Sequence, residues 1–386
     1  MSGGGPVRYR VLVVDDEPLV IASIVAVLDD WARANEVELL AAGSASEART
    51  ILERSDGGAD LVVSDLIMPG GSGGELLREV RRRWPDTVTM IVSGASDIAE
   101  MRAVTTAGVF AYLVKPFEPD ALVAEVDKAI EVARLRRDNR RHEQRLRGEL
   151  AWAGELQRVL LAPDLPADAR FDLSIDYRPL PEFQCGGDFY DVLPASAERW
   201  QFLVGDVGGH GIRAALVTAF LKALAAPAPG ARPPAPGTLL EGLNGRLCQT
   251  LKGAPDLLVT FLACEVDVAT RSLVYAGAGH PPLYLLRGDE ALAFPSEGPG
   301  LGFDPSARYA ERTEALAPGD RLVLYTDGIR EGLPGTAADA ERAFARMLLA
   351  CRREREFAPA VMAWAQRLLG RESFADDATV MSVTIP

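Results

Sequence analysis

Five polar residues come at or just after the ends of short apolar segments near the start of the chain: Asp15, Asp16, Asp65, Ser93 and Lys115. Three of them are aspartates, and carboxylates that meet in one place repel one another unless a cation neutralises their charge. A hard cation with oxygen ligands, such as Mg²⁺, fits such a set. A lysine beside it would then have an anion to hold. These residue types predict a cation site that handles an anionic group.

A repeating pattern of apolar segments and helical stretches would position these side chains. The segments are Val11–Val14, Val37–Leu40, Leu61–Val63, Val88–Val92 and Ala111–Val114. Strands that alternate with helices predict βαβ units and a parallel sheet, in which ligands bind beyond the carboxyl ends of the strands. The alternative is that the polar residues only form turns, which Asp and Ser favour. Their occurrence at successive strand ends favours a site.

A second group of aspartates lies in glycine-rich segments of the other half of the chain. The segments are CGGDFYD at 185–191, VGDVGGHG at 204–211, YAGAGHPPLYLL at 275–286, LYTDGIRE at 324–331 and FADDATVMSV at 374–383. Glycine lets the backbone approach a ligand closely, and clustered aspartates without matching basic residues need divalent cations. Two metals bridged by one carboxylate lower the pKa of a water and orient it for attack on phosphorus. No cysteine or serine nucleophile motif is evident.

Length and composition set limits on the class of protein. The chain has 386 residues, 48% of them hydrophobic, which is enough for two domains and a connector. A net charge of -14 argues against affinity of the whole protein for nucleic acid. The four cysteines form no CxxC pair, which favours reduced thiols in the cytosol. The start MSGGGPVRYR does not resemble a signal peptide and no apolar run spans a bilayer, so we expect a soluble cytoplasmic protein.

The first half resembles the receiver domains of two-component response regulators. The motifs are VLVVDDEP, VVSDLIMPGGSGG, MIVSGAS and AYLVKPF, and the resemblance spans about residues 8–130, with the domain itself expected at 8–118. It implies that a histidine kinase or phosphotransfer protein phosphorylates Asp65. Mg²⁺ would be bound by three side chains and one carbonyl, those of Asp15, Asp16, Asp65 and Ile67. Lys115 would pair with the phosphoryl oxygens, while Ser93 and Tyr112 would act as the switch. This chain has Ser93-Gly94 where many receivers have Thr-Ala, and the serine keeps the hydroxyl donor.

A single long helix is predicted between Pro119 and Pro163, because this stretch contains no internal proline. A coiled-coil seam can be traced through Val132, Leu135, Asn139, His142, Leu146, Glu149, Ala153, Leu156 and Leu160. The polar centre of this seam could fix the register of a homodimer, or the helix could pack against its own receiver. Seven arginines lie between Arg134 and Arg147, which we interpret as a solvated helix face rather than a nucleic-acid or membrane patch.

The segment 163–386 resembles the SpoIIE-like bacterial branch of the metal-dependent protein phosphatases. This resemblance implies an α+β domain with a β-sandwich of two antiparallel sheets flanked by helices. Asp206 would bridge two Mn²⁺ or Mg²⁺ ions with help from the Val207 carbonyl. Asp327 and Asp376 would complete one coordination sphere and Asp188 the other. Four neighbouring residues receive no role from these motifs: Asp191, His210, His280 and Asp377.

Together these resemblances predict a response regulator whose output is a protein serine/threonine phosphatase. The helical linker at 119–162 would transmit the change from the receiver, and residues 1–7 would form a disordered tail. Phosphatases of this branch act on phosphorylated anti-sigma-factor antagonists, which makes such a protein the expected substrate. A catalytically weak adaptor that sequesters its partner is the alternative. A transcription factor would need a helix-turn-helix, and no segment is left over to supply one, so no DNA partner is expected.

Overall fold

The computed structural model describes residues 9–55, 58–69, 73–94, 109–163, 171–250, 258–333 and 335–386. Contacts between residues divide the chain into two compact units, 1–145 and 146–386. The tail predicted at 1–7 lies outside the described residues, as do residues 70–72 and 95–96 of two quoted motifs. Within these described ranges, no helix is long and apolar enough to cross a membrane.

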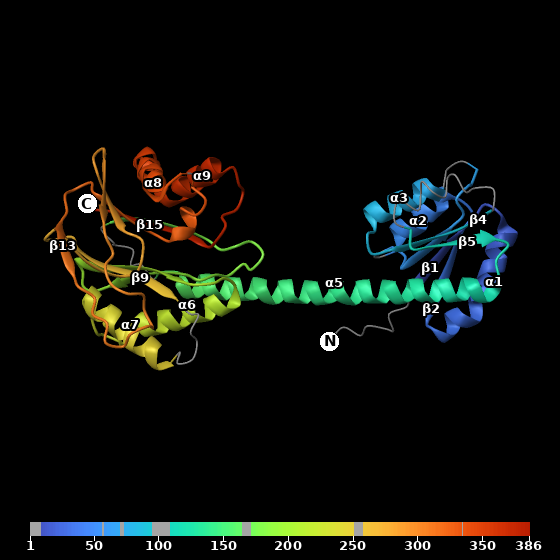
Figure 1. Ribbon diagram of the computed structural model, residues 1–386, viewed down its shortest axis with the longest axis horizontal. Coiled ribbons are helices and arrows are strands. Elements are labelled where there is room, and N and C mark those ends of the chain that lie inside the picture. The colour runs from blue at the N-terminus through green and yellow to red at the C-terminus, as the bar shows by residue number, and fades with distance from the viewer. Residues whose placement is uncertain are drawn as a thin grey trace. The chain divides into compact units, whose positions relative to one another are not determined.

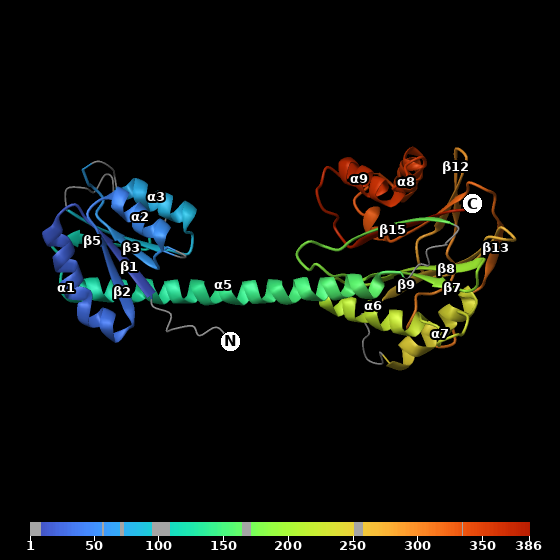
Figure 2. The same ribbon diagram turned by 180° about the vertical axis from the view of Figure 1, so that it is seen from behind.

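The first unit is built on a five-stranded parallel sheet, as predicted. Its strands are β1 (Tyr9–Val14), β2 (Val37–Ala42), β3 (Leu61–Ser64), β4 (Val88–Gly94) and β5 (Ala111–Lys115), in the order β2-β1-β3-β4-β5. Its helices are α1 (Pro18–Ala34), α2 (Ala45–Arg54), α3 (Gly73–Arg83) and the start of α5 (Pro119–Leu161). Helices α2 and α3 cover one face, and α1 with the first turns of α5 covers the other (Figure 2). Every residue of β3 is buried, because helices cover both faces.

Helix α5 is continuous over 43 residues, which confirms the predicted long helix. Its first turns bury apolar side chains in the receiver core: Leu122, Val126, Ala129, Ile130 and Ala133. At its other end, Leu161 is buried in the core of the second unit. Between these ends, the predicted seam residues Leu135 and Leu146 are 61% and 58% exposed. The helix therefore contributes packing to both units and leaves the seam at its centre open to solvent.

Part of the arginine-rich stretch of α5 contacts its own receiver. Arg134 and Arg137 both stack on the ring of Tyr9. Arg137 also pairs with Asp60, and Arg140 pairs with Asp86. Some of these arginines therefore bind the helix to the receiver, in addition to forming part of the solvated face of the helix.

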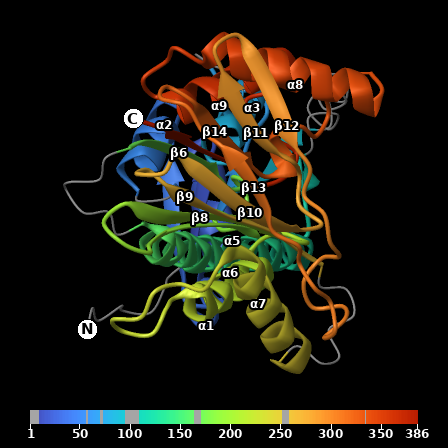
Figure 3. The same ribbon diagram turned by 90° about the vertical axis from the view of Figure 1, so that its left-hand side faces the viewer.

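The second unit contains two five-stranded antiparallel sheets packed face to face, as the resemblance implied (Figure 3). One sheet has the order β13-β10-β9-β8-β7, from β7 (Asp188–Pro194), β8 (Arg199–Val207), β9 (Val259–Asp267), β10 (Ser272–Ala278) and β13 (Arg312–Ala315). The other has the order β12-β11-β14-β15-β6, from β6 (Asp172–Arg178), β11 (Leu283–Arg287), β12 (Glu290–Phe294), β14 (Arg321–Tyr325) and β15 (Ala378–Thr384). The main apolar core lies between the sheets.

Helices cover the outer faces of both sheets (Figure 1). Helices α6 (Ile212–Ala225) and α7 (Pro236–Thr250) lie on the first sheet, and α8 (Ala337–Cys351) and α9 (Phe357–Leu369) lie on the second. A second apolar core fills the space under α8 and α9. The chain between the end of α6 and the start of α7 is rich in proline, and Pro236 is the first residue of α7.

Candidate functional sites

The carboxyl ends of β1 and β3 bring three aspartates together in the first unit. Asp15, Asp16 and Asp65 each offer an oxygen, and these oxygens all lie within 4.8 Å of one another. Asp15 is buried, while Asp16 is exposed. Across the described residues this is the one such group of His, Cys, Asp or Glu side chains gathered so closely. An all-oxygen set that opens to solvent fits a hard divalent cation such as Mg²⁺.

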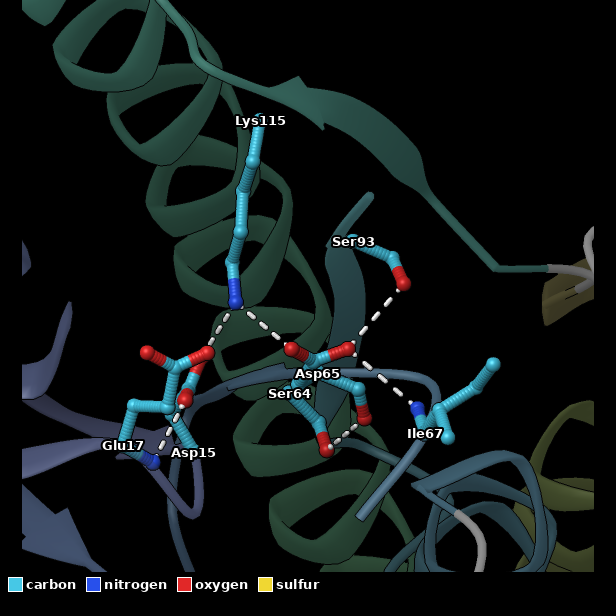
Figure 4. A network of polar contacts seen from close by, with 7 residues as sticks. All are labelled: Asp15, Glu17, Ser64, Asp65, Ile67, Ser93 and Lys115. Atoms are coloured by element: carbon cyan, nitrogen blue, oxygen red, sulfur yellow. Dashed lines mark hydrogen bonds and ion pairs between the residues drawn. The ribbon is translucent and has the colours of Figure 1, made fainter. Parts of the chain in front are cut away.

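Lys115, the last residue of β5, reaches into this acidic group (Figure 4). Its Nζ lies 2.6 Å from Asp15 Oδ2 and 2.5 Å from Asp65 Oδ2. Burial lowers the pKa of this ammonium, but the hydrogen bonds to the two aspartates outweigh burial and raise it above its ordinary value. Lys115 therefore stays charged and is placed to hold an anion at Asp65.

Asp65 is held by contacts on each side of its carboxylate. Its Oδ1 accepts hydrogen bonds from Ser93 Oγ at 3.0 Å and from the Ile67 backbone N–H at 3.2 Å. The Asp65 carbonyl oxygen accepts one from Ser64 Oγ at 2.8 Å. These contacts fix the carboxylate at the exit of β3 with Oδ2 turned towards Lys115 (Figure 4).

The remaining switch residue, Tyr112, lies in β5 and packs against the apolar cluster that contains Leu66 and Met68. These two residues flank Ile67, whose carbonyl is the predicted fourth ligand, and the Ile67 side chain is exposed. The structure thus places Ser93 beside the Asp65 carboxylate and Tyr112 against the apolar cluster to which Leu66 and Met68 belong.

Gly73, which begins α3, permits a close contact that the sequence did not indicate. A methyl group at Gly73 would lie 1.7 Å from the Asp65 carbonyl oxygen. We expect Gly73→Ala to lower the free energy of unfolding of the receiver by about 1–3 kcal/mol, because α3 must move away from β3. At Gly148 nothing lies within 4 Å of an added methyl, so Gly148→Ala in α5 is the matched control. It should stabilise the protein slightly. Urea unfolding measures both, and an unchanged midpoint for Gly73→Ala would contradict the contact.

In the second unit, the two sheets bring four aspartates to one end of the sandwich. Asp188 begins β7 and pairs directly with Asp206 in β8. Asp327 begins the short 3₁₀ helix η1 (Asp327–Ile329) after β14, and Asp376 precedes β15. The link between the sheets is Asp188 Oδ2, which accepts hydrogen bonds from Thr326 Oγ1 at 2.7 Å and Thr379 Oγ1 at 2.6 Å.

The charges of these aspartates act on one another. Burial, followed by the charges of Asp327 and Asp376, raises the pKa of Asp206 to about 7. Burial and Asp206 raise the pKa of Asp188 well above its usual value, against the lowering effect of the two threonines. This excess of buried negative charge fits bound divalent cations. Within the described residues, these carboxylates do not bring three oxygens within 4.8 Å of one another, as the receiver aspartates do.

The backbone beside Asp206 is also close to the start of β7. A methyl group at Gly187 would lie 2.2 Å from the Val207 carbonyl oxygen, the predicted backbone ligand. The Val207 N–H donates to the Gly187 carbonyl at 3.0 Å. Gly187 therefore lets the backbone on either side of Asp188 and Asp206 come close together.

Three of the residues without a predicted role make contacts that explain them. Asp191 is buried and pairs with Lys222 of α6 at 2.6 Å. His210 is exposed and stacks on Phe183 at 4.3 Å between ring centroids. Asp377 is buried and accepts hydrogen bonds from the backbone N–H groups of Leu180 and Gly187. None of these contacts marks a general acid.

His280 is buried, and both of its ring nitrogens bond to protein groups. Nε2 lies 3.0 Å from the Tyr325 carbonyl, which can only accept, so Nε2 carries the proton. Nδ1 then accepts from Thr260 Oγ1 at 2.8 Å. Burial lowers the pKa of His280 to about 3, against the raising effect of the Tyr325 carbonyl. The neutral His280 ring therefore joins Thr260 of β9 to the carbonyl of Tyr325 at the end of β14 through two hydrogen bonds.

We expect this neutral ring to make the second unit sensitive to acid. The unfolded chain takes up a proton near the ordinary pKa of 6.5, but the folded protein does not until about 3. The stability that His280 contributes is therefore complete above pH 6.5 and is lost as the pH falls towards 3. His280→Gln should weaken the pH dependence of thermal unfolding across that range. An identical slope for wild type and variant would contradict the assignment.

Sequence reasoning missed the groups that orient the aspartates. Thr326 and Thr379 stand in the quoted motifs LYTDGIRE and FADDATVMSV, one residue before Asp327 and two after Asp377. A threonine within two residues of an aspartate in each motif was the available signal. Gln157 carries no such signal in the sequence.

A parallel sheet with Asp65 at its edge, followed by an antiparallel sandwich with aspartates at one end, defines a receiver domain joined to a metal-dependent phosphatase domain. Residues 11–127 match the family of response regulator receiver domains, and residues 196–386 match the family of stage II sporulation protein E (SpoIIE). The chain thus combines a response regulator receiver domain with a SpoIIE phosphatase domain of the PP2C type. Both families are metal-dependent.

Known relatives match part of the chain. The hydrogenase transcriptional regulatory protein HoxA of Cupriavidus necator is 34% identical over 177 residues, which is 42% of this chain and 35% of HoxA. The phosphoserine phosphatase RsbU of Bacillus subtilis is 26% identical over 193 residues, 49% of this chain and 55% of RsbU. The chain therefore spans about half or less of these relatives.

Among solved structures, the SiaA-PP2C domain of Pseudomonas aeruginosa is similar to this chain. It is 27% identical with a TM-score of 0.55, and the match covers 64% of this chain and 99% of that domain. This similarity supports the PP2C fold of the second unit.

Proposed function

We propose that phosphorylation of Asp65 by a histidine kinase or phosphotransfer protein controls a serine/threonine phosphatase in the second unit. The observation that carries the proposal is the convergence of Asp188, Asp206, Asp327 and Asp376 at one end of the sandwich, with the pKa of Asp206 raised to about 7. A receiver site with its lysine in place supplies the input.

In the receiver, Asp65 is the residue that accepts the phosphoryl group. Asp15, Asp16, the Asp65 carboxylate and the Ile67 carbonyl would hold Mg²⁺, which neutralises charge on the incoming phosphoryl oxygens. Lys115 would turn from the Asp65 carboxylate to these oxygens. Ser93, now 3.0 Å from Asp65 Oδ1, would donate its hydroxyl to the phosphoryl group, and Tyr112 would fill the space that Ser93 leaves.

In the phosphatase, Asp206 would bridge two Mn²⁺ or Mg²⁺ ions beside the Val207 carbonyl. Asp327 and Asp376 would serve one ion and Asp188 the other. Such a pair supplies a water of lowered pKa that is oriented for in-line attack on phosphorus. The threonines on Asp188 Oδ2 leave its other oxygen for an ion, and burial keeps the carboxylates in place.

The proposed substrate is a phosphoserine or phosphothreonine protein of the anti-sigma-factor antagonist class. The similarity to RsbU, which is named a phosphoserine phosphatase, supports this choice. The choice of substrate rests on this similarity alone, because the four aspartates do not determine which phosphoprotein binds.

A homodimer through α5 would explain its exposed seam. Leu135, Leu146, Leu156 and Leu160 are 61%, 58%, 43% and 39% exposed on a single chain. A parallel pair of α5 helices would bury these side chains, with Asn139 and His142 setting the register.

The proposal is tested by incubating the full chain with Mn²⁺ and a phosphoserine protein and measuring phosphate release before and after chelation. We expect release that stops when the metal is removed. The alternative adaptor would bind the phosphoprotein without releasing phosphate, and its effect would survive Asp327→Asn. Binding without metal-dependent release would therefore replace the proposal with the adaptor.

A further inference from the structure

One polar side chain of α5 is buried inside the second unit. Gln157 is only 4% exposed, although most of its neighbours on the helix face solvent. A buried amide is costly unless its donors and acceptors are paired. The partners of Gln157 therefore indicate what it does.

The Gln157 side chain makes hydrogen bonds through both its oxygen and its nitrogen, mainly to the backbone just before β7. Its Oε1 accepts from the Gly186 N–H at 3.0 Å, and its Nε2 donates to the Gly186 carbonyl at 2.8 Å. The remaining contacts are with Thr218 Oγ1 at 2.9 Å and with the Tyr177 hydroxyl at 3.2 Å. One amide thus satisfies both backbone groups of Gly186, as a neighbouring strand would.

Gly186 is held on its other side by Asp377. The next N–H, that of Gly187, donates to Asp377 Oδ2 at 2.7 Å. A methyl group on Gly186 would lie 2.0 Å from the same oxygen. The backbone that leads into Asp188 is therefore clamped between Gln157 on α5 and Asp377, which follows Asp376 in sequence.

A glycine one turn earlier lets α5 approach this segment. A methyl group at Gly154 would lie 2.2 Å from the Gln184 carbonyl oxygen. Gly154 and Gln157 are three residues apart and so share one face of the helix. Gln184 itself has a φ of 59°, a conformation that non-glycine residues rarely adopt. The close approach fixes the path of residues 184–187 against the helix.

We propose that Gln157 is a positioning residue for the metal site, which holds Asp188 in place through Gly186. This inference rests on the proposed phosphatase function. It makes α5, the helix that begins in the receiver, a structural support of the aspartates in the second unit. Loss of the amide would free the Gly186 backbone and let Asp188 move relative to Asp206, with which it is paired in the sheet. Changes of this kind beyond the direct ligands weaken metal binding by about 10–100-fold.

Mn²⁺ affinity measures this role without relying on activity. Titrations would follow free Mn²⁺ by electron paramagnetic resonance, in full-length proteins that all carry Asp16→Asn to remove the receiver ion. We expect Gln157→Met to weaken Mn²⁺ binding about tenfold or more. Gln157→Glu retains the acceptor for the Gly186 N–H but loses the donor, and should have a smaller effect. Glu155→Gln, on the exposed side of α5, should bind Mn²⁺ like wild type.

Circular dichroism and the thermal midpoint separate positioning from folding. A merely structural glutamine would lower the midpoint while leaving the Mn²⁺ affinity of the folded protein unchanged, and that result would overturn the proposal. If Gln157→Met does not fold, Gln157→Glu and Gly154→Ala decide by the same criterion.

Turnover of a phosphoserine peptide, measured in parallel, distinguishes the two proposals. Weakened Mn²⁺ binding in Gln157→Met without turnover in any protein would support the positioning role and contradict the phosphatase. Turnover by wild type together with an unchanged Mn²⁺ affinity in Gln157→Met would support the phosphatase and contradict the positioning role. A second unit that binds no Mn²⁺ would overturn both.

Discussion

Asp206→Asn should remove Mn²⁺-dependent hydrolysis of a phosphoserine peptide almost completely. Asp206 pairs with Asp188 across β7 and β8, and the charges of Asp327 and Asp376 raise its pKa, so in the proposed site it is the carboxylate that would lie between the two ions. Asparagine keeps the size but cannot carry the bridging charge. We expect a loss beyond the roughly 10–100-fold that changes outside the direct ligands produce. Steady-state phosphate release at saturating Mn²⁺ measures it.

Asp289→Asn is the matched control for this experiment. Asp289 is also an aspartate of the second unit, but its side chain is 85% exposed and it pairs with Arg352 at the surface. It should retain wild-type turnover, because exposed ion pairs contribute little. If Asp206→Asn retains wild-type turnover, Asp206 does not bridge the metals.

Asp65→Asn should abolish covalent phosphorylation of the receiver. The Asp65 carboxylate lies 2.5 Å from Lys115 Nζ and 3.0 Å from Ser93 Oγ, so phosphoryl oxygens bound to it would meet their donors at this position. An amide is not a nucleophile for phosphorus under these conditions. Mass spectrometry of the protein after treatment with a small phosphodonor and Mg²⁺ measures the effect.

The control for phosphorylation is Asp30→Asn, an exposed position in α1. It should be labelled to the same extent as wild type. Labelling of Asp65→Asn at another residue of the receiver would show that Asp65 is not the acceptor.

The receiver was predictable because its signals are local. Each predicted apolar segment is a strand in the structure. The polar residues at the ends of these segments lie at one edge of the sheet, because parallel strands all point the same way. The contact between Gly73 and the Asp65 carbonyl was not predictable, since it depends on how α3 approaches β3.

The phosphatase site was predictable only as a set of residue types. The aspartates were found from their glycine-rich motifs, but their pairing depends on contacts between residues far apart in the chain. Thr379 reaches Asp188 across 191 positions, and no local pattern encodes such a contact. Gln157 was missed for a related reason: a single glutamine in a polar helix looks solvated until the β6–β7 segment packs on it.

The state of Asp65 should control the activity of the phosphatase. The direct test compares Mn²⁺-dependent turnover of a phosphoserine peptide with and without beryllofluoride, which mimics the phosphorylated aspartate, in wild type and in Asp65→Asn. A coupling of about 1–3 kcal/mol predicts a change in wild-type turnover of about fivefold or more, in one direction, that is absent in Asp65→Asn. Equal turnover in wild type with and without beryllofluoride, in a protein that demonstrably binds it, would contradict the claim.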